Sequence, residues 1–280
     1  DGGQTVQHLH FHLIGGGKMN EKMIKRSQFL YVLEAAFEYL ISILVANSYL
    51  ATLTKQLGMS DSLTGIISSF ISLGCLFQLL SMALHKKRFK TIVTVMSILN
   101  QLLFMFLYVI PVVPLGPNVK IAAFVVTIFA AYFIYNLVHP KKINWFMSLI
   151  DDEKRGRFTA VKEMVSLIIG MAFTFGMGAV VDYYKDAGKI RTAFLISAAV
   201  IFLLMIVHTL TMVFSVEKEN NAVPEKNIFA GIADVLKDKS VLKVTVVFAL
   251  WQVASYVTIP FYGTYQIAEL GFSLKYVSLL

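Results

Sequence analysis

Cysteine and charged residues are both scarce in this chain of 280 residues. The single cysteine, Cys75, has no partner for an internal disulfide, and no metal-ligand cluster accompanies it in the sequence. Charged residues make up 15% of the chain, against about 25% in an ordinary soluble domain. These scarcities exclude a disulfide scaffold, a disordered chain and an ordinary soluble enzyme.

Apolar residues are abundant instead, at 57% of the chain. They form seven stretches of 18 to 25 residues, at 28–52, 62–84, 91–115, 121–139, 164–181, 192–216 and 244–267, and an eighth begins near Tyr276. A helix of about 20 residues crosses the hydrocarbon core of a bilayer, and the stretches lack the alternation of barrel strands. We therefore predict an all-α polytopic membrane protein, with the lipid bilayer as a partner.

Basic residues are distributed unequally between the two sides of these spans. Of the 25 Lys and Arg residues, 19 fall on the side of the amino end, and six fall on the other side: Lys55, Lys120, Lys185, Lys189, Arg191 and Lys275. The positive-inside rule then predicts a cytoplasmic amino terminus in a multi-pass protein of the cell membrane. The formal charge of +8 follows from this bias, so we expect no nucleic-acid partner.

The order of spans and loops resembles the major facilitator superfamily. Six spans precede a polar connection at 217–243 with an amphipathic helical stripe, and a seventh span follows. The turn between spans two and three is basic, with Lys86, Lys87 and Arg88. The next inner loop contains the run Arg155, Gly156, Arg157. The fifth span is glycine-rich, with Gly170, Gly176 and Gly178. Small residues in a span allow helices to approach closely.

The resemblance implies a secondary transporter that moves a small-molecule solute by alternating access, with a solute site near mid-membrane. It implies a six-helix half at 18–216, a cytoplasmic linker at 217–243, and the seventh helix and the start of the eighth at 244–280. Lys86, Lys87, Arg88, Arg155 and Arg157 would form cytoplasmic gating loops. The chain has no phosphate-binding Gly-x-x-x-x-Gly-Lys-Ser/Thr run. We expect facilitative or ion-coupled transport, with protons or another coupling ion, and no cofactor or metal.

Glu34 and Glu38 are the two charged residues inside the predicted spans. A carboxylate in a bilayer is costly and usually faces a cavity or a partner, and a separation of four places both on one helix face. One hypothesis is a proton relay or a cation contact. The alternative is that both lie near the inner end, where water or a basic loop residue pairs them.

Uncharged polar residues also interrupt the spans. As candidates for the wall of the transport cavity we take Asn47, Gln78, Asn136, Gln252 and Tyr256, and we note Asn100, Gln101 and His208 as further polar residues within spans. A solute site mixes aromatic walls with a few polar groups. The alternative for each residue is a hydrogen bond between helices.

The amino end has a different character. His8, His10 and His12 alternate with apolar residues between two Gly-Gly pairs, which predicts a short strand with three imidazoles on one face. Residues 1–17 resemble the signature of the histidine triad family of nucleotide hydrolases and transferases. The resemblance implies His10 as nucleophile, flanked by His8 and His12, with Gln4 and Thr5 near the phosphate.

The strand alone cannot build a nucleotide pocket, so we expect no catalysis by this segment without an upstream domain, and a nucleotide partner only if that domain exists. We regard residues 1–17 as a remnant, and the whole chain as a fragment that does not transport by itself. Either a complete hydrolase domain precedes it as a natural fusion, or two neighbouring genes were joined by an assembly error.

Overall fold

The structure is a computed structural model that describes residues 21–70, 74, 77–83, 89–217, 237–256 and 259–277. Within these residues the chain is helical and contains no strand, which confirms the predicted all-α class. The strand predicted at the amino end and most of the linker at 217–243 lie outside the described residues.

Five helical segments are long and apolar enough to cross a membrane: Glu21–Gln56, Lys90–Val109, Pro117–Met147, Asp152–Asp186 and Ile190–Phe214. They comprise α2 (Glu21–Leu44) with α3 (Asn47–Gln56), α6 (Phe89–Val109), α7 (Pro117–Met147), α8 (Arg155–Asp186) and α9 (Ile190–Phe214). These segments correspond to the predicted first, third, fourth, fifth and sixth spans, although the third ends at Val109 and not at residue 115.

The other two predicted spans fall on shorter elements, each interrupted by residues that the structure does not describe. The stretch at 62–84 begins in α4 (Asp61–Ser68) and ends in a 3-10 helix, η1 (Gln78–Ala83). The stretch at 244–267 covers most of α11 (Lys239–Tyr256), then α12 (Ile259–Thr264) and part of a π-helix, η3 (Tyr265–Glu269). A short helix, α13 (Leu274–Val277), follows.

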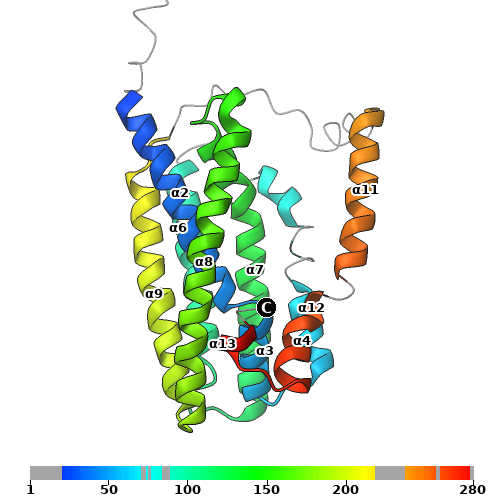
Figure 1. Ribbon diagram of the computed structural model, residues 1–280. Helices are drawn as coiled ribbons and strands as arrows, with labels where there is room; N and C mark the ends of the chain where they lie inside the picture. The colour runs from blue at the N-terminus through cyan, green and yellow to red at the C-terminus, as the bar shows by residue number, and fades with distance from the viewer. Residues whose placement is uncertain are drawn as a thin grey trace, which may run out of the picture.

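The long helices stand side by side in one bundle (Figure 1). Helix α6 packs against α7 and α9, while α2 packs against α8 and α9. In the view of Figure 1, the lower end of the bundle carries the end of α8 and the starts of α7 and α9, and the upper end carries the start of α2 and the ends of α7 and α9.

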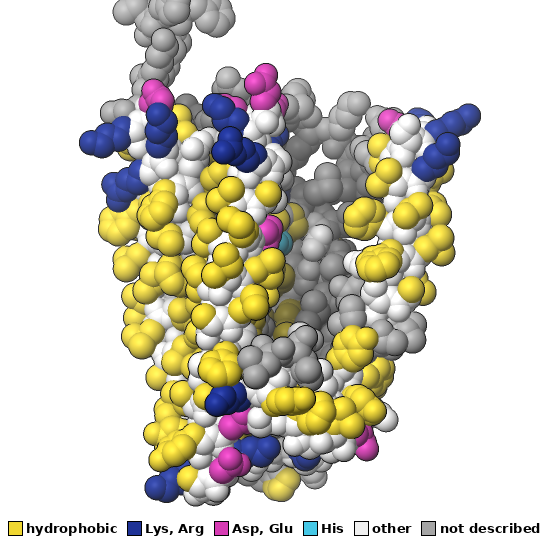
Figure 2. All heavy atoms as spheres, viewed as in Figure 1, with side chains coloured by type: hydrophobic (Ala, Val, Ile, Leu, Met, Phe, Trp, Pro, Cys, Tyr) yellow, Lys and Arg dark blue, Asp and Glu magenta, His cyan; other side chains and the backbone are white. Residues whose placement is uncertain are grey.

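Helix α11 differs from the others in its surroundings. Its described side chains are exposed over nearly the whole helix, and it stands apart from α7 and α8 at the upper end (Figure 1). Figure 2 shows the molecule hollowed between α8 and α11, with an acidic and a histidine side chain visible at the wall of the hollow. Apolar side chains cover the outer faces of the long helices, as expected of surfaces that meet lipid.

The first span is broken in the middle, although the sequence predicted one continuous helix. Helix α2 ends at Leu44, and α3 begins at Asn47, which has a φ of 45°. Asparagine is among the residues that adopt this left-handed conformation most readily. The hydroxyl of Tyr108 donates to the carbonyl of Leu44, and that of Tyr132 donates to the carbonyl of Val45 at 3.1 Å. These bonds satisfy carbonyls that the break leaves without helical partners.

Helix α7 is longer than the predicted fourth span. The predicted span ended at residue 139, but the helix continues through Pro140 to Met147. Proline is tolerated inside membrane helices where neighbouring groups satisfy the freed backbone. The extension brings Lys142, which the sequence assigned to an inner loop, into the interior of the bundle.

Candidate charged site in the helical bundle

Three helices bring charged and titratable side chains together inside the bundle. Glu34 and Glu38 are one turn apart on α2, so both point from the same face. His139 and Lys142 are one turn apart on α7, and His208 comes from α9. The site therefore joins side chains that are up to 174 residues apart in the chain.

Lys142 lies between the two carboxylates. Its Nζ is 2.6 Å from Oε1 of Glu34 and 2.5 Å from Oε1 of Glu38. Lys142 is 2% exposed and Glu34 is 0% exposed. At this depth each ion would be very costly alone, so the ammonium group and the carboxylates lie in direct contact. This is the pairing with a basic residue that the sequence left open, except that the base lies on a spanning helix.

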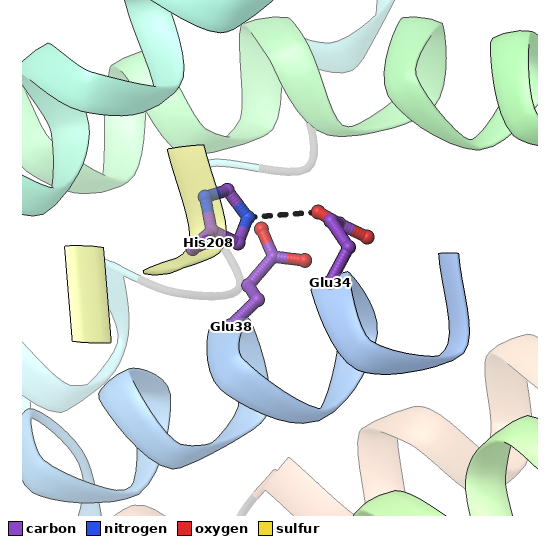
Figure 3. A group of neighbouring side chains, drawn as sticks. All are labelled: Glu34, Glu38 and His208. Carbon is purple, nitrogen blue, oxygen red and sulfur yellow. Dashed lines mark hydrogen bonds and ion pairs between the residues drawn. The ribbon is translucent and has the colours of Figure 1, made fainter. Parts of the chain in front are cut away.

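His208 completes the buried side of the site. Its Nε2 is 2.8 Å from Oε1 of Glu34 (Figure 3), and its ring is fully buried. Because a carboxylate only accepts hydrogen bonds, Nε2 carries the donated hydrogen. Oε1 of Glu34 thus contacts both Lys142 and His208, while its second oxygen, Oε2, has no hydrogen-bond partner within the described residues.

Glu38 and His139 form the more open side of the site. Their side chains are 20% and 28% exposed, and Nδ1 of His139 is 3.8 Å from Oε2 of Glu38. A small recess adjoins them, and its other lining residues include Ser97, Asn100 and Tyr135. The ring of Tyr135 stacks on His139 with centroids 4.7 Å apart. Protons and small polar groups can therefore reach the cluster from this side.

The same residues resemble a metal-ligand set, since Glu34, Glu38 and His208 offer ligand atoms within 4.8 Å of one another. However, the ammonium of Lys142 already lies within 2.6 Å of both carboxylates. The chain thus supplies its own cation at the position that a metal would need. The chemistry that this arrangement supports best is proton exchange among carboxylates, imidazoles and an ammonium group.

Two of the predicted cavity residues bind each other. Nε2 of Gln78 donates to Oδ1 of Asn136 at 3.1 Å, and Nδ2 of Asn136 donates to the carbonyl of Tyr132 at 2.9 Å. Asn136 is buried. The pair links η1 to α7, which matches the alternative of a hydrogen bond between helices.

The remaining predicted residues lie away from the cluster or outside the described part. Asn47 is exposed at the start of α3, about 20 Å along the span from Glu34. Gln252 is exposed on α11. Arg155 pairs with Asp152 at 2.8 Å and Arg157 is exposed, both at the upper end. The side chain of Tyr256 and residues Lys86, Lys87, Arg88, His8, His10, His12, Gln4 and Thr5 lie outside what the structure describes.

Lys142 and His139 are the site residues that the sequence prediction missed. A signal was present, since two carboxylates inside one span require a cationic partner, and Lys142 is close to the end of a predicted span. Ending that span before Pro140 removed it from consideration.

The three glycines of the fifth span differ in the space around them. A Cβ added at Gly170 would lie 3.0 Å from Cδ1 of Tyr39, and one added at Gly178 would lie 2.8 Å from the backbone nitrogen of Lys275. A Cβ at Gly176 would meet nothing within 4 Å. Gly170 and Gly178 therefore allow close approaches, whereas Gly176 does not.

Comparison with known proteins identifies the family of the chain. Residues 29–280 match the family model described as Major Facilitator Superfamily. No curated protein and no solved structure matches the sequence. The matched region holds all five candidate membrane spans except the first residues of the first span, and it holds the complete charged cluster. The chain belongs to the major facilitator superfamily of membrane transporters.

Proposed function

We propose that this protein is a secondary transporter that moves a small solute by alternating access, coupled to protons through the charged cluster. Superfamily membership and the spanning helices support transport across a membrane. In this proposal α2 to α9 belong to the first six-helix half, and α11 to α13 begin the second half, which rocks against the first.

The charge balance of the cluster carries the proposal for proton coupling. Two carboxylates, Glu34 and Glu38, face one ammonium group, Lys142, in the bundle interior. With both histidines neutral, the cluster holds one net negative charge, and an uncompensated charge in a low-dielectric interior is costly. Uptake of one proton makes the cluster neutral. Glu38 and His139 offer the route by which that proton arrives, since they form the exposed side.

The proposed orientation follows from the basic residues. With 19 of 25 Lys and Arg residues assigned from sequence to the side of the amino end, the upper end faces the cytoplasm in the cell membrane. The arrangement of α11 agrees with an inward-facing state, because α11 stands apart at the upper end (Figure 1) while α12 and α13 pack against α3 and α8 at the lower end.

The test uses the full-length protein in liposomes. Sugars, peptides, drug-like molecules and organic ions are first screened for thermal stabilisation, and each hit is then tested for flux with a pH-sensitive dye inside the vesicles. We expect solute flux that moves protons in the wild type. In Glu34→Gln/Glu38→Gln, the flux should lose its dependence on the proton gradient. Proton coupling unchanged by the double substitution would contradict the role of the cluster, and an absence of flux for every hit would contradict transport.

The resemblance of residues 1–17 to the histidine triad family stays a prediction from sequence. The family match begins at residue 29, and those residues lie outside the described part of the structure. Nucleotide hydrolysis or transfer by His10 would require an upstream nucleotide-binding domain, as the sequence prediction states.

A further inference from the structure

The lower end of the molecule is closed by contacts in which backbone meets backbone. We infer that Gly178 and Gly263 form the gate that closes the outer face of the transporter, because each glycine lets a segment of one half touch the backbone of the other. This inference rests on the proposed function, since it assigns the two sides of these contacts to the two moving halves.

Gly263 is the first of these contacts. It lies on α12 and packs on the break in the first span, where an added Cβ would lie 2.6 Å from both the carbonyl oxygen of Asn47 and the nitrogen of Ser48. These are backbone atoms, so a side chain at 263 cannot be accommodated by rotating a neighbour. Beside this contact, Oγ of Ser48 donates to Oε1 of Gln266 at 3.4 Å. The broken helix thus presents α3 to α12.

Gly178 is the second contact. It lies on α8, and an added Cβ would lie 2.8 Å from the nitrogen of Lys275 and 2.9 Å from the carbonyl carbon of Leu274. One turn further along α8, Asp182 accepts hydrogen bonds from the nitrogens of Leu274 at 3.0 Å and Lys275 at 2.7 Å. Asp182 therefore holds the start of α13 on the surface that Gly178 leaves open.

Both contacts suit surfaces that separate and meet again. A glycine contact has no side chain to repack, and the polar groups beside it pair with each other when it closes. Alanine at either position would push the backbones apart and favour the state in which the lower end is open. Gly176, two residues before Gly178 on the same helix, has open space around it and provides a matched control.

The test measures access to the gate from outside. Ser48 is buried in the closed arrangement, so a Ser48→Cys reporter, with Cys75→Ser as background, reports opening by its reaction with a membrane-impermeant maleimide in intact cells. We expect Gly178→Ala and Gly263→Ala each to raise the labelling rate about tenfold. Gly176→Ala should leave it unchanged. Equal labelling rates in all three variants would overturn the inference.

A second experiment applies even if a glycine variant fails to fold. Ser48→Cys and Gln266→Cys, in the same background, should form a disulfide under mild oxidation and lock the lower end. Maleimide should react with neither cysteine of the locked protein until the disulfide is reduced. Reduction should also restore any solute flux. Failure of the pair to cross-link in folded protein would also overturn the inference. Neither labelling nor cross-linking requires a solute, so their outcomes are independent of the flux assay that tests the proposed function.

Discussion

The charged cluster and the lower end hold helices together by opposite means. In the cluster, Glu34, Glu38, Lys142 and His208 come from α2, α7 and α9, which are neighbours within one bundle. At the lower end, glycine backbones join α12 and α13 to α3 and α8. The first kind of contact lies within the proposed first half, and the second lies between the two halves.

The difference follows from the cost of breaking each kind of contact. Removing one partner from a buried ion pair costs about 3–5 kcal/mol, because the other charge is left unpaired in a medium that does not solvate it. Such a contact suits helices that stay together during transport. A backbone contact at glycine leaves no ion buried without its partner when it opens, because Asp182 beside it is only partly buried, so it suits surfaces that part in every cycle.

The substitution Lys142→Met breaks the ion pairs of the charged cluster and should have the largest effect on stability. It removes the ammonium and leaves Glu34 and Glu38 facing each other in the interior. We expect a loss of about 3–5 kcal/mol of stability, measured by thermal or denaturant unfolding of the full-length protein in detergent. Lys141→Met is the control, because the adjacent side chain makes no ion pair with these carboxylates.

The same substitution sharpens the comparison when it is combined with Glu34→Gln and Glu38→Gln. Removing all three charges should restore most of the stability, since no buried charge is then left unpaired. If Lys142→Met unfolds at the same point as Lys141→Met, the cluster does not hold the helices together in the way described.

The substitution Asp182→Ala tests the second kind of contact and should have the smaller effect. It removes the acceptor for the nitrogens of Leu274 and Lys275, while Gly178 keeps the close approach. A lost capping interaction costs about 1 kcal/mol. We expect labelling of the Ser48→Cys reporter to rise about fivefold.

Asp186→Ala serves as the control for that measurement, because Asp186 is an exposed residue one turn further along α8. A labelling rate for Asp182→Ala that matches the rate for Asp186→Ala would show that the gate does not depend on this carboxylate.

Much of the fold was predictable because apolar runs of span length leave the chain few alternatives in lipid. The break at Asn47 was not predictable, since it depends on hydroxyl groups of Tyr108 and Tyr132 from other helices. The close approaches at Gly170 and Gly178 followed from small residues in the fifth span, but their partners, Tyr39 and the start of α13, depend on tertiary packing.

The site was predictable in part for the same physical reason. Glu34 and Glu38 stood out because charge inside a span is costly. The pairing partner Lys142 did not, because the predicted span ended at residue 139, whereas the helix continues to Met147. His208 was noted as a polar residue within a span, yet its contact with Glu34 joins residues 174 positions apart, which composition and spacing do not reveal.

The central claim is that the cluster takes up one proton to become neutral, and proton binding tests it without any solute. The full-length protein in detergent is brought from about pH 8 to about pH 5, the range in which an ordinary histidine changes its charge, and bound protons are counted with a dye. The wild type should bind one proton more than Glu34→Gln/Glu38→Gln/Lys142→Met, which keeps none of the three buried charges, with the difference appearing in one step. Equal proton uptake by the two proteins would contradict the claim.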